Sequence, residues 1–344
     1  MELKDWGLEH KELWQRIISV IESHQHFLLT SHINPDGDAL GSELALAEYL
    51  ESLGKKVTII NSDPVPAIYQ FLDRERKIRR FSPKRHASLI ARIEVIIVLD
   101  ASGGWSRIGS IGPMLEQSQA IKLCIDHHPD WHPFADITVI DTEAAATGEL
   151  IYSLIRTMGG VITKDIAEFL YAAILTDTGS FRFPKTRPQT HCITAELIAT
   201  GADPLYMYRQ IYERNSLGLI RLKGYVMGSI KTAAGGQVAY YSLSQKTMDE
   251  YKVRSTELDG VASLGQQIDN VRVSIFCLET ANGQVKVSLR SDGTVAVNQI
   301  AIQYGGGGHA SAAGAIIAGQ LEPVTHELVA RIVALLARKE DHEC

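Results

Sequence analysis

Short apolar runs alternate with stretches of helical periodicity through the first half of the chain. The apolar runs cover residues 27–30, 57–60, 95–99 and 121–125. Between the first two runs, apolar side chains recur every three or four positions over residues 39–53, as they do on the buried face of a helix. Continuous apolar strands that alternate with helices are typical of a parallel sheet covered on both faces. This half therefore predicts an α/β domain.

The second half of the chain has a different pattern. Helical periodicity dominates residues 146–201, and one or two further helices are expected over 204–230. Beyond them, strand-like runs alternate with helices, and Ala281-Asn282-Gly283-Gln284 has the sequence of a hairpin turn. This order favours a smaller α+β domain. We predict three parts: a first domain over residues 1–200, a helical connector over 201–230 and a second domain over 231–344.

Composition and charge narrow the class of protein. A length of 344 residues suits about two domains, and 45% hydrophobic with 22% charged residues is the composition of a globular chain. The 34 basic and 40 acidic residues give a net charge of −6, which argues against non-specific binding of long nucleic acid but leaves room for a short anionic ligand.

No apolar run reaches the ~18 residues of a membrane span, and the acidic N-terminus does not resemble a signal sequence. We therefore expect a cytoplasmic protein without membrane partners. The four cysteines form no CxxC pair, so a thiolate zinc site is not indicated.

The loop after the first apolar run carries His32, Asp36 and Asp38 within Ser31-His32-Ile33-Asn34-Pro35-Asp36-Gly37-Asp38. Loops that leave the carboxyl ends of parallel strands form the ligand crevice of an open sheet. One aspartate could simply cap the next helix. A single cap does not account for a histidine and two aspartates within seven residues, so a metal site is the competing interpretation.

Further acids and histidines follow other predicted elements. Asp100 ends the run over 95–99, and Asp126-His127-His128 ends the next run. Asp177 ends the helix expected over residues 166–176. Imidazole nitrogens and carboxylate oxygens without a thiolate suit Mn²⁺ or Mg²⁺ better than structural zinc. A pair of such ions bridged by a carboxylate is a general device for phosphoryl displacement. The sequence contains no GxGxxG after the first strand, no GxxxxGK[ST] and no GxSxG, which argues against dinucleotide binding, P-loop hydrolysis and a serine nucleophile.

The C-terminal part carries a possible phosphate-binding segment. Four glycines at 305–308 precede His309, and they are either a flexible hinge or a place where a phosphate or base approaches the backbone closely. Arg290, in Ser288-Leu289-Arg290-Ser291, is either a surface residue or a guanidinium that binds phosphate. Arg107, in the loop after Asp100, either reaches a phosphate or only anchors that loop.

Taken in this order, these motifs resemble the DHH phosphoesterase family over essentially the whole chain. The resemblance rests on HINPDGDALGS, Asp100, Asp126-His127-His128, TDTGSF, SLRS and GGGGHASAAG, the last two being similar to the DHH-associated C-terminal domain. It implies an α/β fold with a parallel-sheet DHH domain, a smaller α+β domain and an active site in the cleft between them. The branch that the chain resembles most comprises bifunctional oligoribonucleases that also dephosphorylate 3′-phosphoadenosine 5′-phosphate (pAp).

The resemblance also implies roles for individual residues. His32, Asp36 and Asp100 would hold one divalent ion, and the ligands of the second would be Asp38, Asp100, His127 and Asp177. His128 would lie beside the reacting phosphate, with Asp126 orienting a histidine, so the catalytic set is His128, Asp100 and Asp126. The residues expected to bind substrate are Arg290, Gly306, Gly307, Gly308, His309 and Arg107.

The implied reaction is two-metal hydrolysis of phosphate esters in short nucleotides. Mn²⁺ is the expected ion, with Mg²⁺ and Co²⁺ as alternatives. Short RNA oligonucleotides (nanoRNA) would be degraded to mononucleotides, and pAp would be converted to AMP; long duplex nucleic acid is not expected as a partner, and a homodimer remains open. The alternative activity is a phosphodiesterase for cyclic or linear dinucleotides of the c-di-AMP and pApA type, which would use the same metal ligands. A binding module that has lost catalysis is a third interpretation.

Overall fold

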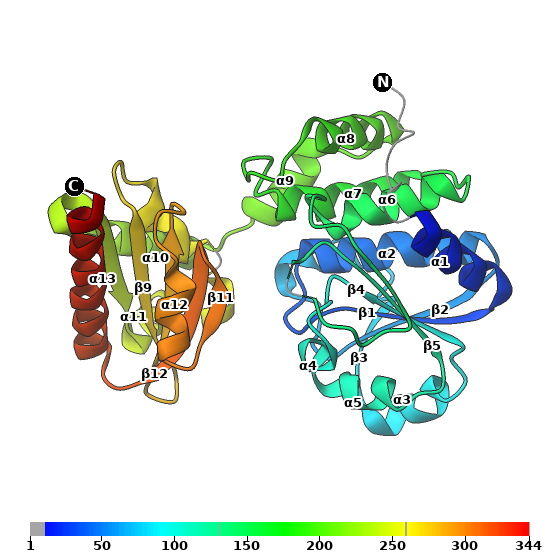
Figure 1. The fold of residues 1–344 in the computed structure, drawn as a ribbon, viewed down its shortest axis with the longest axis horizontal. Helices are drawn as coiled ribbons and strands as arrows, with labels where there is room; N and C mark the ends of the chain where they lie inside the picture. The colour runs from blue at the N-terminus through cyan, green and yellow to red at the C-terminus, as the bar shows by residue number, and fades with distance from the viewer. Residues whose placement is uncertain (1–10, 130, 259, 344) are drawn as a thin grey trace. The chain divides into compact units, whose positions relative to one another are not determined.

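The computed structural model describes residues 11–129, 131–258 and 260–343, and it divides into two compact units. The first unit is Met1–Arg214 and the second is Asn215–Cys344. Each described unit contains its own sheet and its own hydrophobic clusters (Figure 1). The division falls within residues 201–230, the range in which the sequence predicts a connector.

The described part of the first unit contains a six-stranded parallel sheet in the order β3-β2-β1-β4-β5-β6. Its strands are β1 (His26–Thr30), β2 (Lys56–Asn61), β3 (Ile78–Arg80), β4 (Val95–Leu99), β5 (Ile121–Asp126) and β6 (Ile137–Ile140). The four apolar runs correspond to β1, β2, β4 and β5, so the α/β prediction is confirmed. The edge strands β3 and β6 were not predicted, because three and four residues are too few to show a strand pattern.

Helices cover both faces of this sheet, and the side chains of its central strands alternate between them. Phe27 and Leu29 of β1 pack in one hydrophobic cluster, whereas Leu28 packs in another on the opposite face. On the first face lie α1 (Lys11–Ser23), α2 (Gly37–Ser52) and α6 (Thr147–Thr157). Outside them, α7 (Lys164–Asp177) packs on α2 and α6, and α8 (Pro188–Thr200) and α9 (Pro204–Tyr212) pack on α7. On the other face lie α3 (Pro83–Ile90), α4 (Trp105–Ile108) and α5 (Gly112–Glu116) (Figure 1). Burial on both faces explains why these strands are continuously apolar.

Strand β1 pairs with β2 on one side and with β4 on the other, so the strand order reverses direction there. In open α/β sheets, ligands bind outside the carboxyl ends of strands at such a switch point. The loops that follow β1, β4 and β5 all leave from this edge. The sheet therefore brings the acids and histidines of three separate motifs to one place.

Helix α2 is buried on nearly all sides, whereas its periodicity predicted burial along one face. The reason is that it packs against the sheet and also against α6 and α7. Gly41 permits the approach of α7, because a Cβ atom there would overlap the carbonyl oxygen of Phe169 and lie 3.0 Å from Cβ of Ala173. The close packing of α2 and α7 fixes the start of α2 relative to the end of α7.

The described part of the second unit contains a six-stranded mixed sheet in the order β11-β12-β10-β9-β8-β7, in which β8 and β9 are parallel. Its strands are β7 (Lys231–Ala233), β8 (Val238–Leu243), β9 (Val273–Glu279), β10 (Gln284–Ser291), β11 (Gly307–His309) and β12 (Ala312–Ala318). One face packs on α12 (Val297–Gln303) and α13 (Leu321–Glu343), and the other on α10 (Leu217–Ser229) and α11 (Gln245–Tyr251). The predicted hairpin joins β9 to β10, and the α+β prediction is confirmed.

Among the described residues, no helix combines the length and apolar character that a membrane crossing requires.

Replacing Gly41 with alanine should lower the thermal stability of the first unit. Alanine gains ~1 kcal/mol in a helix relative to glycine. Overpacking against the Phe169 carbonyl costs about 1–3 kcal/mol and should outweigh that gain. The midpoint of thermal unfolding, followed by circular dichroism, should therefore fall.

Gly224→Ala on α10 is the matched control, because no atom lies within 4 Å of the added Cβ. This substitution should stabilise the protein by ~0.5–1 kcal/mol through helix propensity alone. A Gly41→Ala variant that is as stable as Gly224→Ala would contradict the close packing of α2 on α7.

Candidate metal centre

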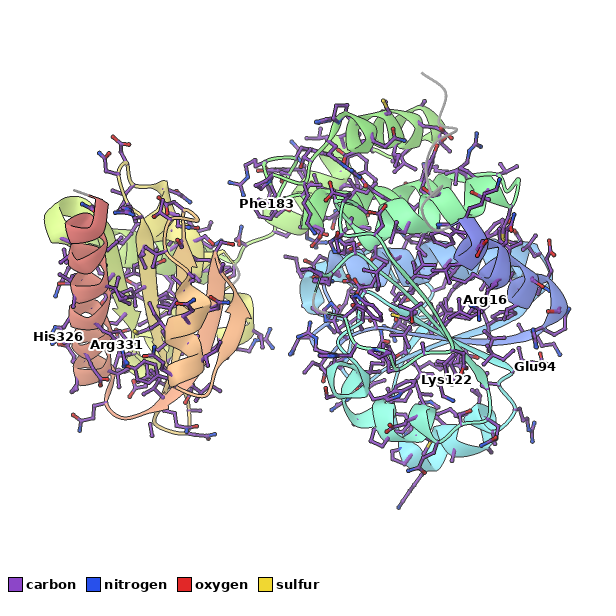
Figure 2. All side chains as sticks on the ribbon, viewed as in Figure 1. Arg16, Glu94, Lys122, Phe183, His326 and Arg331 are labelled. Atoms are coloured by element: carbon purple, nitrogen blue, oxygen red, sulfur yellow. The ribbon has the colours of Figure 1, made fainter. Side chains whose placement is uncertain are left out.

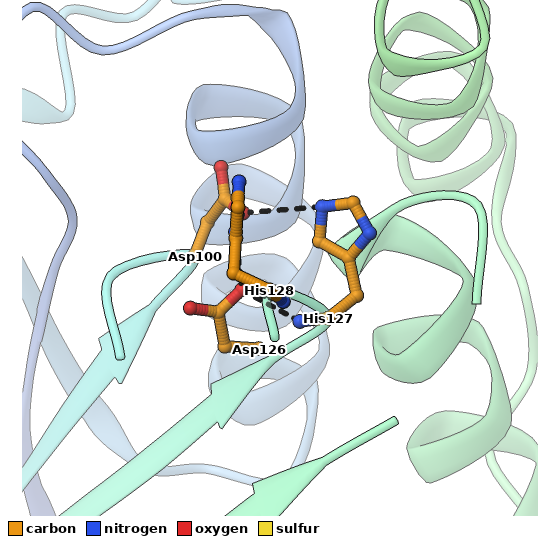
Figure 3. A group of neighbouring side chains, drawn as sticks. All are labelled: Asp100, Asp126, His127 and His128. Carbon is orange, nitrogen blue, oxygen red and sulfur yellow. Dashed lines mark hydrogen bonds and ion pairs between the residues drawn. The ribbon is translucent and has the colours of Figure 1, made fainter. Parts of the chain in front are cut away.

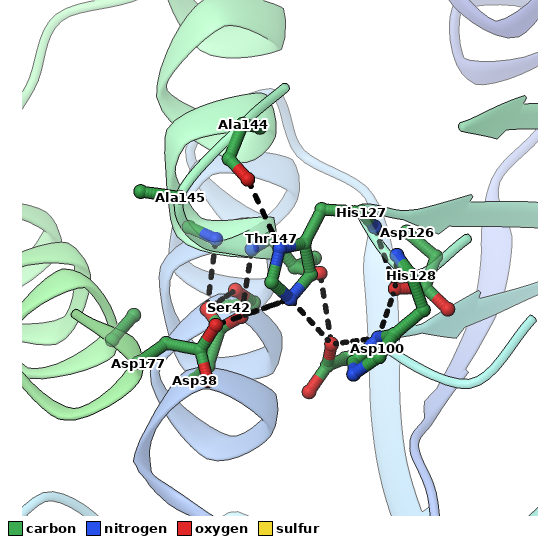
Figure 4. Close-up of polar contacts among 12 residues, drawn as sticks. Asp38, Ser42, Asp100, Asp126, His127, His128, Ala144, Ala145, Thr147 and Asp177 are labelled. Carbon is green, nitrogen blue, oxygen red and sulfur yellow. Dashed lines mark hydrogen bonds and ion pairs between the residues drawn. The ribbon is translucent and has the colours of Figure 1, made fainter. Parts of the chain in front are cut away.

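The structure brings seven of the predicted residues together at the carboxyl edge of the first sheet. Figure 4 labels Asp38, Asp100, His127, His128 and Asp177 of this group, with Asp126 beside the two histidines. Each comes from the end of an element or from the loop that follows it. The seven residues are His32, Asp36, Asp38, Asp100, His127, His128 and Asp177. The grouping follows from the sheet topology, since the carboxyl ends of β1, β4 and β5 are neighbours.

Two sets of ligand atoms match the two ion sites that the resemblance implies, and a third set is Asp100, Asp126, His127 and His128, whose atoms also lie within 4.8 Å of one another. His32, Asp36 and Asp100 offer atoms within 4.8 Å of one another, and Asp38, His127 and Asp177 form a second such set. Asp100 lies between the sets: its Oδ2 is 3.4 Å from Nε2 of His32, and its Oδ1 is 3.6 Å from Nε2 of His127. Asp100 has a left-handed backbone with φ of 58° at the end of β4, a strained conformation of the kind that clusters at functional sites. Its two oxygens therefore face different sets, and Asp100 would be available to both ions if each set held one.

His127 has the geometry of a metal ligand. Its Nδ1 lies 3.1 Å from the carbonyl oxygen of Ala144, which can only accept, so Nδ1 carries the proton and Nε2 presents a lone pair. Nε2 is buried without a hydrogen-bond partner among the described residues. It lies 3.2 Å from Oδ2 of Asp177 and 3.8 Å from Oδ2 of Asp38. Burial lowers the pKa of His127, so the ring is neutral at pH 7. A lone pair that faces carboxylates is favourable when a cation lies between them.

His32 is oriented by a backbone carbonyl in the same way, although its ring is protonated near neutral pH without metal. Its Nδ1 lies 2.8 Å from the carbonyl oxygen of Ile33, which directs Nε2 toward Asp100 and Asp36. Asp36 also caps α2, because its Oδ1 accepts hydrogen bonds from the backbone N–H groups of Asp38 and Ala39. The capping and metal-site interpretations of this loop are therefore compatible, since the capping Oδ1 of Asp36 also lies 3.9 Å from Nε2 of His32.

Asp38 is fully buried and is held by the N-terminus of α6. The backbone N–H of Thr147 donates to Oδ2 at 2.7 Å and that of Gly148 to Oδ1 at 2.9 Å. Ser42 donates to Oδ1 as well, at 3.3 Å. The positive end of a helix dipole stabilises a carboxylate. Even so, burial and the charge of Asp100 raise the pKa of Asp38 well above its usual value.

Asp126 contacts His128, and together with Asp100 and His127 these two residues form a group whose ligand atoms lie within 4.8 Å of one another (Figure 3). Its Oδ2 accepts from the backbone N–H of Ser102 at 2.6 Å. Its Oδ1 accepts from the backbone N–H of His127 at 2.6 Å and lies 2.8 Å from Nδ1 of His128. With both oxygens engaged, Asp126 fixes the two histidines that follow it.

The metal-free centre takes up protons to relieve repulsion among its acids. Burial, together with the charges of Asp100 and Asp36, raises the pKa of Asp177 to about 8. Burial would raise the pKa of Asp100 too, but hydrogen bonds from His128 and His32 hold it far below its usual value. Although burial lowers the pKa of His32, its hydrogen bond to Asp100 and the nearby charges raise it to about 9. Asp100 is thus ionised and lies near two groups, His32 and Asp177, that are protonated near neutral pH.

Thr147 belongs to the site although no motif indicated it. Its hydroxyl donates to Oδ1 of Asp100 at 3.1 Å, and its side chain is completely buried. The signal in the sequence was weak: Thr147 and Gly148 lie at the start of a helix, where such residues are common for capping alone.

The predicted substrate-binding residues of the second unit lie on its sheet. Arg290, Gly306 and Gly307 line a groove of about 620 Å³, together with Lys286 and Gly314 among others. A Cβ at 306 would overlap the carbonyl oxygen of Gly314, so the glycine there permits close strand packing. Part of the glycine run is strand β11, which argues against a simple hinge.

Gly308 and Arg107 have other structural roles, and for His309 only the backbone is described. Gly308 pairs with Ala313 in the sheet. His309 has a described backbone in β11, but its side chain lies outside the described part of the structure. Arg107 accepts a hydrogen bond at its carbonyl oxygen from the N–H of Ile33, so its backbone anchors the His32 loop while its side chain is exposed.

Comparisons with known proteins agree with the two units. A model of the N-terminal domain of the DHH family matches residues 26–174, and a model of the DHHA1 domain matches residues 235–338. The bifunctional oligoribonuclease and PAP phosphatase NrnA of Thermus thermophilus is 32% identical over 295 residues, which are 85% of this chain and 84% of that protein. The protein of the same name from Bacillus subtilis is 28% identical over 305 residues, 88% of this chain and 92% of its own.

A solved structure is similar over nearly the whole chain. It is described as an exopolyphosphatase-related protein from Bacteroides fragilis, and it has a TM-score of 0.90 at 29% identity. The match covers 95% of this chain and 98% of that one.

Metal affinity should rise between pH 6 and pH 8.5. Asp177, with a pKa of about 8, and His32, with a pKa of about 9, must release protons before they bind an ion. Calorimetric titration with Mn²⁺ at several pH values should show tighter binding and proton release as the pH rises. The Asp177→Asn variant should show a shallower pH dependence. An affinity that is constant or falls over this range would contradict these protonation states.

Without metal, the stability of the fold should change in the opposite direction. The folded state holds protons on Asp177 and His32 that the unfolded chain releases near pH 4 and pH 6.5. The free energy of unfolding should therefore fall as the pH rises from 6.5 to 9 in a chelator, measured by urea denaturation. Added Mn²⁺ should reverse this trend; equal curves with and without the ion would argue against the site.

Proposed function

The chain belongs to the DHH family of phosphoesterases, and we propose that within this family it hydrolyses phosphate esters of short nucleotides. It is a metal-dependent phosphoesterase. The proposed reactions are the degradation of RNA oligonucleotides of a few residues to mononucleotides and the removal of the 3′-phosphate from pAp to give AMP. Relatives that carry the name bifunctional oligoribonuclease and PAP phosphatase support this assignment.

The observation that carries the proposal is the buried lone pair of His127, which faces carboxylates with no hydrogen-bond partner among the described residues. This donor set fits divalent ions that prefer nitrogen and oxygen ligands, with Mn²⁺ proposed first and Mg²⁺ or Co²⁺ as alternatives. The residues that would hold one ion are His32, Asp36 and Asp100, and those for a second are Asp38, Asp100, His127 and Asp177. Such a pair supplies a nucleophile from water at neutral pH and neutralises charge on the phosphoryl oxygens.

His128 and Asp126, which belong to neither proposed ion site, would orient the phosphate. The hydrogen bonds of His128 to Asp100 and Asp126 raise its pKa to about 11 despite burial, so the ring is cationic at neutral pH. Asp126 fixes the direction of this ring at Nδ1. A cationic imidazole beside the acids can donate to an oxygen of the reacting phosphate.

The second unit would bind the part of the nucleotide that does not react. Arg290 offers a guanidinium that matches a phosphate, and the glycines of the groove expose their backbone. His309 and Gly308 extend this proposed surface, and Arg107 is proposed to assist from the first unit. A short substrate suits this arrangement, because the net charge of −6 leaves no extended basic track.

A panel of substrates tests the assignment. With Mn²⁺, kcat/KM should be high for pAp and for RNA of two to five residues, and low for cyclic di-AMP. The comparison measures phosphate or mononucleotide release under identical conditions. Preference for cyclic di-AMP over both other substrates would move the function to dinucleotide signalling instead.

Arg290→Ala should raise KM for pAp and short RNA while metal binding is unchanged, because Arg290 belongs to the second unit and is not one of the predicted metal ligands. The matched control is Arg254→Ala, which removes an arginine from an exposed ion pair with Glu257. Equal KM values for wild type and Arg290→Ala would mean that the groove does not bind these substrates.

Salt dependence should be shallow and nearly independent of RNA length. Each phosphate bound by Lys or Arg adds roughly 0.7 to the slope of log K against log salt for a single strand. If only the first few nucleotides are bound, 2-mer and 10-mer RNA should give similar slopes, with mononucleotides released stepwise. A slope that increases steadily with length would indicate an extended groove and contradict the preference for short substrates.

A further inference from the structure

The segment that follows α7 has an unusual and fixed conformation. Gly179, Ser180 and Phe181 are consecutive left-handed residues, with φ values of 54°, 61° and 64°. Left-handed conformations cost free energy for residues other than glycine and persist when packing imposes them. Phe181 supplies that packing, since its ring stacks on His191 with centroids 5.3 Å apart. This segment begins directly after Asp177, so it is well defined at the edge of the metal centre.

Lys185 lies near the end of this segment and returns to the site. Its Nζ donates to the carbonyl oxygen of His127 at 3.4 Å. Its charge also acts on Asp177, where it lowers the pKa against the larger effect of burial. The ammonium group is therefore near His127 and near Asp177, two residues that belong to one proposed ion site.

A structural role accounts poorly for this lysine. Among the described residues no carboxylate lies within ion-pair distance of its Nζ, and the hydrogen bond to His127 is long. Lys185 is exposed, and an ammonium group has three protons to donate. By contrast, Arg182 of the same segment holds the turn itself, because its Nε donates to the carbonyl oxygen of Gly179 at 2.7 Å.

We propose that Lys185 binds a non-bridging oxygen of the substrate phosphate at the metal centre and so is a further substrate-binding residue of the first unit. A phosphate that enters this site meets the carboxylates Asp36, Asp100 and Asp177, so an additional fixed cation beside them favours its binding. This inference rests on the proposed function in one respect: both require that the metal centre binds a phosphate or a phosphate ester.

The test compares Lys185→Gln with Lys185→Arg and with a matched control, Lys122→Gln. Lys122 lies near the start of β5, at the end of the strand away from the metal centre. Its Nζ donates to the carbonyl oxygen of Ser118 at 2.7 Å. Figure 2 labels Lys122 and also Phe183, which lies two positions before Lys185 in the chain. The two labelled residues lie on separate parts of the first unit. Both glutamine variants remove one positive charge, so they change the net charge of the protein equally.

The first readout is the affinity of the Mg²⁺-loaded protein for inorganic phosphate, by calorimetry. Lys185→Gln should weaken binding by about 10- to 100-fold, as expected for a lost charge-assisted hydrogen bond. Lys185→Arg should restore most of the affinity, and Lys122→Gln should match the wild type. All four proteins should bind Mg²⁺ to saturation and retain the circular dichroism spectrum of the wild type, so that the phosphate titrations compare folded, metal-loaded proteins.

The second readout is kcat/KM for pAp and for 2-mer RNA, which should fall by a similar factor in Lys185→Gln. Weaker phosphate binding in a protein that hydrolyses neither substrate would support the role of Lys185 and reject the proposed substrates. Hydrolysis of both substrates with unchanged phosphate affinity and unchanged kcat/KM in Lys185→Gln would overturn the inference. Equal losses in Lys122→Gln, or no phosphate binding by the loaded wild type, would also overturn it.

Discussion

Mutual repulsion among Asp38, Asp100 and Asp177 around the imidazole of His127 is the constraint on which the site depends. Asp38 and Asp100 are buried, and water therefore screens their charges little. The fold offsets part of this repulsion with the amide groups at the start of α6 and with the protons on His32 and His128. The repulsion that remains favours the binding of divalent cations. Metal affinity and the low stability expected at high pH without metal thus have the same electrostatic origin.

The scaffold holds these acids in place because each lies at the end of a rigid element. The switch in strand order at β1 brings three strand ends together, and the glycine contact between α2 and α7 sets the distance from Asp38 to Asp177. The second unit has a groove of its own around Arg290. Under the proposed function, the metal ligands lie on the first sheet and the groove around Arg290 on the second, which would permit one to vary in sequence without disturbing the other.

Local pattern was sufficient to predict the central strands and the acids and histidines that follow them, because the carboxyl ends of neighbouring parallel strands must meet. It was not sufficient for contacts that depend on the tertiary fold. Thr147 reaches Asp38 across 109 positions in the chain, and no periodicity encodes that contact. The same is true of Lys185, an exposed lysine whose position is set by a left-handed turn. The edge strands β3 and β6 are short and depend on pairing with their neighbours, so their own residues predict them poorly.

The central claim is that Asp100 joins two ion sites that carry out phosphoester hydrolysis. Its most direct test measures bound Mn²⁺ and turnover of pAp in Asp100→Ala beside Asp136→Ala, a control at the opposite end of β5. Asp100→Ala should retain its circular dichroism spectrum, bind less Mn²⁺ and lose activity by several orders of magnitude, whereas Asp136→Ala should retain both. Turnover near the wild-type rate by Asp100→Ala in saturating Mn²⁺ would contradict the account.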